Sequence, residues 1–108
     1  MTSSKDYVAY IMEQLAEAGD VRNRAMMGEY VVYYRDKVLG GIYDDRFLVK
    51  PVTAAKELMP EAEFIIPYRG AKEMLLVDNI EDKAFLAQLC REMYDQLPAP
   101  KPKKKRSK

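Results

Sequence analysis

The chain has 108 residues, a length that fits one domain, and its 48% hydrophobic and 32% charged residues are typical of a globular protein. It contains no histidine and one cysteine, which excludes imidazole catalysis, histidine-ligated zinc, thiolate metal clusters and a disulfide within the chain. The formal net charge of +1 hides a split, because the last eleven residues hold six cations and no acid, so residues 1–97 carry −5.

A helix is predicted at the start of the chain, from Ser4 to Ala18. Its apolar side chains recur three and four residues apart, the spacing that gives a helix one buried face: Tyr7, Val8, Ile11, Met12 and Leu15. Ser3 or Ser4 is suited to be the N-cap, because its hydroxyl can accept a hydrogen bond from a backbone N–H of the first turn. Gly19 suits the end of the helix, because glycine adopts the left-handed conformation without strain.

An antiparallel meander is predicted next, because residues 21–50 are rich in β-branched and aromatic residues interrupted by short turns. The expected strands are Tyr30–Tyr34, Val38–Tyr43 and Arg46–Lys50, with Val21–Met27 as an optional earlier strand. Pro51 ends this region, since proline has no N–H to donate to a neighbouring strand.

The second half is expected to form a short helix, two strands around a turn at residues 67–70, and a long last helix: Thr53–Met59, Glu63–Ile66, Glu73–Val77 and Ile80–Leu97. Asp78 or Asn79 is the expected N-cap of the last helix. That helix carries an apolar stripe with Cys90 beside it, made of Phe85, Leu86, Leu89, Met93 and Leu97. Each buried side chain of this kind contributes roughly 1.5–3 kcal/mol, so the helix is essential to the fold.

These elements predict an α+β fold, an antiparallel β-sheet meander with packed helices in the order α-βββ-α-ββ-α. Residues 1–97 form the expected domain, and residues 98–108 a disordered basic tail, because proline favours extended backbone and like charges repel. No secretory signal and no apolar run near the ~20 residues of a membrane span are present, which predicts a cytoplasmic protein without membrane association.

Tyrosine and glycine dominate residues 28–51, and they are interpreted first as scaffold. In Tyr30–Tyr34 the side chains alternate between the two faces of a strand, and tyrosine suits a half-buried pleated surface. Gly40-Gly41 within a strand indicates either a bulge with close packing or a close approach by a ligand, and packing is the favoured interpretation.

Acidic pairs are the remaining candidates for acid–base or metal chemistry. Asp44-Asp45 and the pair Glu61 with Glu63 are considered, but hairpin turn chemistry is favoured for Asp44-Asp45, because adjacent side chains point apart. Cys90 on a buried helical stripe is interpreted as a small core side chain.

An enzyme would require a carboxylate, a tyrosine and a lysine brought together by the fold, such as Glu29, Tyr68 and Lys72. The sequence shows no further constellation of this kind and no nucleotide-binding glycine loop. The expectation is therefore a protein without catalytic residues, cofactor or metal.

The run RAMMGEYVVYYRDKVLGGIYDDRFLVKP, residues 24–51, resembles the N-terminal domain of the TfoX/Sxy family of bacterial proteins, and PYRGAKEMLLVDN, residues 67–79, resembles its second glycine-bearing turn and strand. Met27 stands where that family often has an aromatic residue. The matching positions are scaffold positions: Arg24, Met26, Gly28, Tyr30, Phe47, Leu48, Lys50 and Gly70.

The resemblance spans about residues 5–97. It implies an antiparallel sheet packed against helices, similar to secretion-chaperone-like domains, and it supplies no catalytic residues. The family is best known for regulators of competence for DNA uptake, whose longer members carry a second, C-terminal domain. For this chain the resemblance implies a module like the first domain.

The sequence supports two candidate functions. The first is a non-catalytic regulatory or protein-interaction module that acts through its sheet surface, with an unidentified protein partner or as a homodimer. The alternative is weak, non-specific nucleic-acid association, in which the tail cations contact phosphates: Lys101, Lys103, Lys104, Lys105, Arg106 and Lys108. A merely solubilising tail is the competing interpretation of those charges.

Overall fold

The computed structural model describes residues 4–26 and 29–98. Within them lie three α-helices, one 3₁₀ turn and six strands, so the predicted α+β class is confirmed. The elements are α1 (Lys5–Leu15), η1 (Ala16–Ala18), β1 (Val21–Met26), β2 (Glu29–Tyr34), β3 (Lys37–Ile42), β4 (Phe47–Val49), α2 (Thr53–Leu58), β5 (Phe64–Ile65), β6 (Met74–Leu76) and α3 (Lys83–Tyr94).

The optional first strand is present as β1, so four strands rather than three precede α2. All neighbouring strands pair antiparallel, in the spatial order β1-β2-β3-β4-β6-β5. The chain passes from β4 through α2 and β5 to β6, and β6 then pairs with β4. The last hairpin therefore extends the meander into a single sheet.

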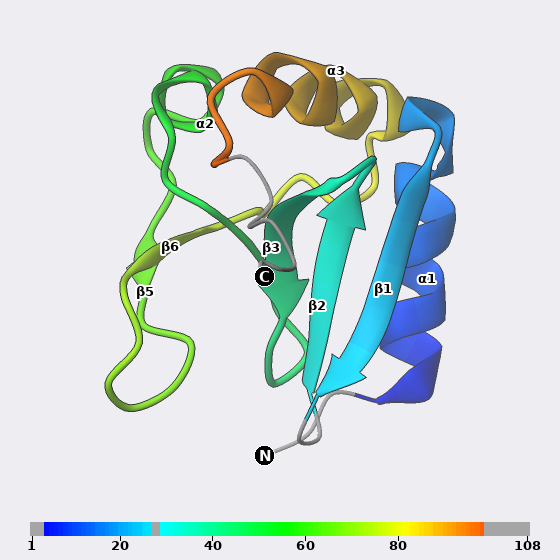
Figure 1. Ribbon diagram of the computed structural model, residues 1–108, viewed down its shortest axis with the longest axis vertical. Helices are drawn as coiled ribbons and strands as arrows, with labels where there is room; N and C mark the ends of the chain where they lie inside the picture. Colours follow the sequence, from blue (N-terminus) through cyan, green and yellow to red (C-terminus); the bar gives the residue numbers. More distant parts are fainter. Residues whose placement is uncertain (1–3, 27–28, 99–108) are drawn as a thin grey trace, which may run out of the picture.

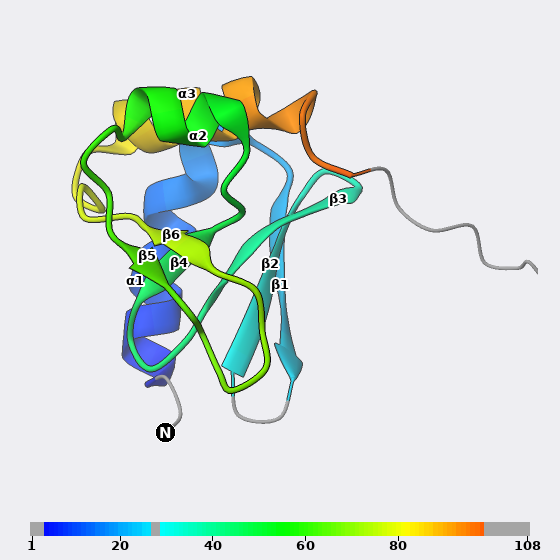
Figure 2. The ribbon, with the colours of Figure 1, turned by 90° about the vertical axis from the view of Figure 1, so that its left-hand side faces the viewer.

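The helices lie on one face and at one end of this sheet. Figures 1 and 2 show α1 behind β1 and β2, and α3 with α2 across the end of the sheet. Within the described residues no helix lies on the other face of β1–β3 (Figure 2). An antiparallel sheet tolerates this arrangement, since one face can pack on the core while the other meets water.

Serine and aspartate caps fix where the long helices begin. The Ser4 hydroxyl accepts a hydrogen bond from the Tyr7 backbone N–H at 3.1 Å, as predicted for one of the two serines. The predicted cap of the last helix was wrong, because Asp82 accepts from the Phe85 N–H at 3.0 Å and α3 begins at Lys83. A carboxylate placed three residues before that N–H satisfies it, and Asp78 and Asn79 lie too early in the chain to do so.

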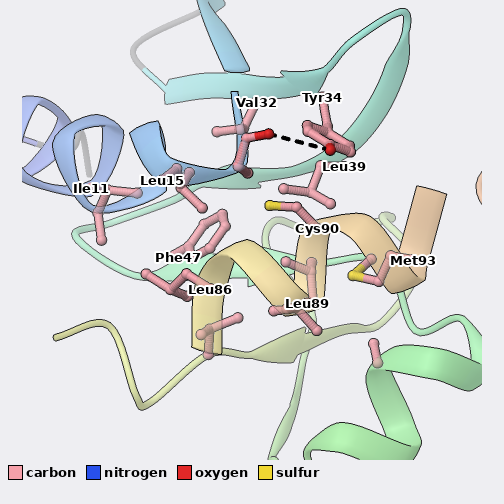
Figure 3. Packing of buried hydrophobic residues seen from close by; sticks show 14 of the residues in the cluster. Ile11, Leu15, Val32, Tyr34, Leu39, Phe47, Leu86, Leu89, Cys90 and Met93 are labelled. Atoms are coloured by element: carbon pink, nitrogen blue, oxygen red, sulfur yellow. Dashed lines mark hydrogen bonds between the residues drawn. The ribbon is translucent and has the colours of Figure 1, made fainter. Parts of the chain in front are cut away.

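The core lies between α3, α1 and the sheet. Leu86, Leu89, Cys90 and Met93 of α3 are buried as the stripe predicted, and Figure 3 shows them packed with Phe47 and other apolar side chains of the sheet. Leu97 is also buried, whereas Phe85 is only partly so.

Strand β2 alternates as expected. Val32 and Tyr34 are buried in the core and Tyr30 packs against it, so Val31 and Tyr33 lie on the other face. The Tyr34 hydroxyl donates a hydrogen bond to the Ala18 carbonyl oxygen at 3.4 Å, the dashed line of Figure 3.

Gly40 and its neighbours explain the glycine pair of β3. The register of β2 and β3 shifts between Val32, which faces Gly40, and Tyr33, which faces Val38, so Leu39 is an extra residue in a bulge. A Cβ on Gly40 would overlap the Leu48 carbonyl oxygen and lie 2.7 Å from Val49 Cα. Close packing of β3 on β4 therefore requires glycine here.

Replacing Gly40 by alanine is expected to lower the free energy of unfolding by about 3 kcal/mol or more, because the atoms in the way are backbone and cannot rotate aside. Gly70→Ala is the matched control: Gly70 has φ +87° but open space around it, so only about 1–2 kcal/mol of left-handed strain is expected. Urea unfolding followed by circular dichroism measures both. Equal losses in the two variants would contradict the packing explanation.

Candidate functional site

The uncovered face of the sheet carries two adjoining hollows of about 580 and 570 Å³. Both are bordered by Met26, Val31, Tyr43, Pro67 and Tyr68, so they form one continuous groove across β2, β3 and the segment between β5 and β6. We call it the tyrosine groove, since its lining includes four tyrosines and three prolines: Tyr30, Tyr33, Tyr43, Tyr68, Pro51, Pro67 and Pro98.

The glycine pair shapes this groove as well as the sheet. A Cβ on Gly41 would lie 2.5 Å from Tyr43 Cε2 and 2.8 Å from the Tyr30 carbonyl oxygen. The missing side chain therefore leaves room for the Tyr43 ring to lie over the strand. Tyr68 packs against that ring, with centroids 5.9 Å apart and planes at 53°.

The hydroxyl of Tyr43 has a shifted pKa. Partial burial raises the pKa of its hydroxyl above the ordinary value, and the nearby Tyr68 and the Glu29 carboxylate add to the increase. The hydroxyl therefore stays protonated at neutral pH, ready to donate a hydrogen bond. Tyr68 is 61% exposed, so its ring is available at the surface.

The acidic pair at one end of the groove belongs to a turn, as expected from its sequence. Asp44 and Asp45 have φ of 53° and 56°, and the N–H groups of Tyr43 and Arg46 each donate to the other residue's carbonyl oxygen at 2.9 and 3.0 Å. Two successive left-handed residues are the signature of a type I′ hairpin turn. Asp45 also accepts a hydrogen bond from the Ser4 N–H at 2.8 Å.

The acid, tyrosine and lysine considered for catalysis are only partly brought together. Glu29 and Tyr68 line the same hollow, where the Glu29 carboxylate accepts a hydrogen bond from the Asp44 N–H at 3.2 Å. Lys72 lines only the second hollow, with Tyr68. Glu61 and Glu63 are both exposed on the loop before β5.

Cys90 is fully buried in the core, and burial raises the pKa of its thiol to about 12. The thiol is thus protonated at neutral pH and lies away from the groove. In the described ranges 4–26 and 29–98, no three acidic or cysteine side chains cluster to hold a metal ion.

The residues that match the family motif lie in different environments: some are exposed, one packs against the core, and some border the groove. Arg24 and Met26 are exposed on β1, and Met26 borders the groove. Tyr30 packs against the core, Lys50 lines the second hollow, and Gly70 has the positive φ of a turn. Gly28 and Met27 lie outside the described residues, as do all six tail cations: Lys101, Lys103, Lys104, Lys105, Arg106 and Lys108.

Sequence reasoning missed the groove itself. Tyr33 and Val31 were assigned to the other face of β2, but nothing local indicated that residues 67–74 would border that face. The one available signal was the combination of Gly40-Gly41 with clustered tyrosines, which indicated a close approach without giving the partner.

The fold and the groove define the class of protein: a small α+β domain with an open, tyrosine-lined sheet face. Residues 13–97 match the TfoX N-terminal domain family, and the chain belongs to that family. It is also similar to an uncharacterized 12.7 kDa protein in the trpE 5′ region of Spirochaeta aurantia, with 37% identity over 109 residues covering 100% of this chain and 95% of that protein. No solved structure matches the chain significantly.

Among the described residues, no helix is long and apolar enough to cross a membrane.

A second polar cluster joins the β2–β3 turn to the end of α3. The Tyr94 hydroxyl donates to Asp36 Oδ1 at 2.7 Å, and Lys37 Nζ donates to the Tyr94 carbonyl oxygen at 3.0 Å while lying 4.2 Å from the Tyr94 ring centroid. Arg35 lies over the Tyr34 and Tyr94 rings at 5.4 and 5.5 Å. Because these groups satisfy one another, the cluster is structural.

Tyr94→Phe is expected to change how stability depends on pH. The Tyr94 hydrogen bond lowers the pKa of Asp36 below its ordinary 3.8, so its contribution is present above that value and is lost as pH falls through the folded-state pKa. The same bond raises the pKa of Tyr94 above 10.0, so the contribution is also lost as pH rises through that raised value.

The difference in unfolding midpoint between wild type and Tyr94→Phe should therefore be largest near neutral pH and shrink at both extremes. Urea titrations at a series of pH values measure it, and Tyr10→Phe on α1, a tyrosine outside this cluster, is the control. A difference that stays constant from acid to alkali would exclude the Asp36 coupling.

Proposed function

We propose that this protein is a non-catalytic regulatory module of the cytoplasm that binds a partner protein through the tyrosine groove. The observation that carries the proposal is the groove itself, an apolar and aromatic hollow on a sheet face that no helix of the described residues covers.

The groove has the composition of a protein-binding surface. Interfaces are enriched in tyrosine, methionine and arginine, and clustered exposed apolar side chains mark such surfaces. Tyr68 and Met26 are 61% and 51% exposed, and both border the groove. Tyrosine supplies a large ring for contact and a hydroxyl for a hydrogen bond, which supports binding of a peptide or protein.

Binding is favoured over catalysis by the residues available. The chain has no histidine, the Cys90 thiol is buried with a pKa of about 12, and Asp44 and Asp45 form a turn. Glu29 accepts a hydrogen bond from that turn. A general base with a pKa near neutrality is the usual requirement for acid–base catalysis, and histidine, the residue that most often supplies it, is absent from the sequence.

A regulatory role is favoured by the family, best known through regulators of competence. The partner is a protein, either a different one or a second copy of this chain. The similar Spirochaeta aurantia protein is uncharacterized and adds no partner of its own.

The double variant Met26→Ala, Tyr68→Ala should lose the bound partner while keeping its fold, since both side chains are more than half exposed. Tyr10→Ala is the matched control, because Tyr10 is a 38% exposed tyrosine on α1 and does not border the groove.

Quantitative affinity purification from the native cell compares wild type with these variants, and calorimetry with the purified partner confirms direct binding. Light scattering over a concentration series tests for a homodimer. Recovery of the same partners by the groove variant, or none by wild type together with a strictly monomeric protein, contradicts the proposal.

Nucleic-acid association is the second candidate, and the charge split favours it. Six cations stand in the last eleven residues, against −5 for the rest of the chain. Any attraction to phosphates would thus come from residues 101–108, and it would be independent of base sequence.

If this candidate holds, binding to duplex DNA should weaken steeply with salt, the slope of log K against log [salt] reaching about −0.9 for each phosphate contact. Replacing all six tail cations by glutamine in the full chain should abolish it. Fluorescence anisotropy with a labelled duplex measures both effects, and Arg22→Gln, Arg24→Gln on β1 is the control for cations elsewhere. Unchanged affinity in the glutamine variant would refute this function.

A further inference from the structure

We infer that the tyrosine groove accepts a proline-spaced, lysine-rich peptide segment, and that its occupant is this chain's own segment 99–108. The inference rests on the proposed function in using the same groove, and it adds the chemistry of the ligand. A protein partner would then have to displace this segment or resemble it.

The segment begins directly beside the groove. Gln96 and Pro98 border the second hollow, so residue 99 starts at the rim of the groove without any linker. An extended chain rises about 3.1 Å per residue, so ten residues reach about 31 Å. Six strands at the usual spacing are roughly 24 Å wide, so the segment can span the groove.

The side chains of the segment match the lining. Proline-rich peptides dock into aromatic-lined grooves because their extended backbone is preformed and loses little entropy on binding. Pro98, Pro100 and Pro102 alternate with residues whose backbone the following proline restricts to extended conformations. The groove offers the rings of Tyr33, Tyr43 and Tyr68.

The order of charges along the segment also matches the groove. The segment runs from prolines at residues 98–102 to cations at residues 103–106. The groove runs from the hollow bordered by Pro98 to the other hollow, where Glu29 and Asp44 outnumber Arg46. The first 97 residues carry −5, so the domain as a whole also attracts the cations.

A spin label on the full-length protein tests the inference. Ser107→Cys adds a second cysteine, and because Cys90 is buried with a raised pKa, labelling favours the new thiol. The expected result is a loss of amide NMR signal intensity at Tyr43, Tyr68 and their neighbours. The amide of Tyr10, on α1, should keep its intensity.

Two substitutions test separately the aromatic contact and the charge attraction between the segment and the groove. Tyr68→Ala in the labelled chain should restore the groove signals, because it removes an exposed aromatic wall without touching the core. Asp44→Asn should restore them in part, because asparagine keeps the left-handed turn but removes a charge. Tyr10→Ala should leave the signal loss unchanged. Two results would overturn the inference. One is equal signal intensity at Tyr10, Tyr43 and Tyr68, and the other is a signal loss that neither Tyr68→Ala nor Asp44→Asn relieves.

A mixed sample distinguishes the occupant. Isotope-labelled protein without the spin label is combined with spin-labelled protein at natural abundance, so that only contacts between copies cause a loss. No loss supports the chain's own segment, and a loss as large as in the single-species sample overturns it in favour of a second copy. Failure of the proposed function is recognised separately, by partner recovery that does not depend on Met26 and Tyr68.

Discussion

The close approach of β3 to β4 at Gly40-Gly41 is the constraint on which the rest of the structure depends. Gly40 lets the backbone of β4 lie where a side chain would be, and Gly41 leaves the space that the Tyr43 ring occupies. One face of this contact supports Phe47 and the core under α3. On the other face, Tyr43 lies against Gly41 and packs on Tyr68. The same pair of residues therefore determines both the packing of the sheet and the hollow on its open side.

Local patterns predicted most of the elements, because helical spacing, strand alternation and turn residues depend on neighbouring positions. The buried stripe of α3, the Ser4 cap and the turn at Asp44-Asp45 are of this kind. The pairing of β6 with β4 is not local, since α2 and β5 separate the two strands in the chain. The groove depends on that pairing, because it carries Pro67 and Tyr68 to the open face. Its lining could not be derived from periodicity.

The single sheet also explains why the open face is aromatic and not simply polar. Leu48 is fully buried although it pairs with Gly41, on the face away from Phe47 and Val49. Side chains of other positions must therefore keep water from Leu48, because Gly41 beside it has no side chain. Tyr43, which lies against Gly41, and Tyr68, which packs on the Tyr43 ring, are aromatic side chains of this face. The tyrosines that pack on this face are thus also those of the proposed binding surface.

That double use limits what evolution or mutagenesis can change at the site. A smaller residue at Tyr43 would remove the partly buried ring that lies against Gly41 and packs on Tyr68, whereas Tyr68, 61% exposed, contributes chiefly to the outer wall of the groove. A larger residue at Gly41 would displace Tyr43. Specificity for a ligand can therefore vary at Tyr68, Met26 and the charged ends of the groove, while Gly41 and Tyr43 must stay constant to hold the sheet. The groove thus has a constrained floor at Gly41 and Tyr43 and a rim that tolerates change, which is the arrangement that the proposed binding of an extended segment would require.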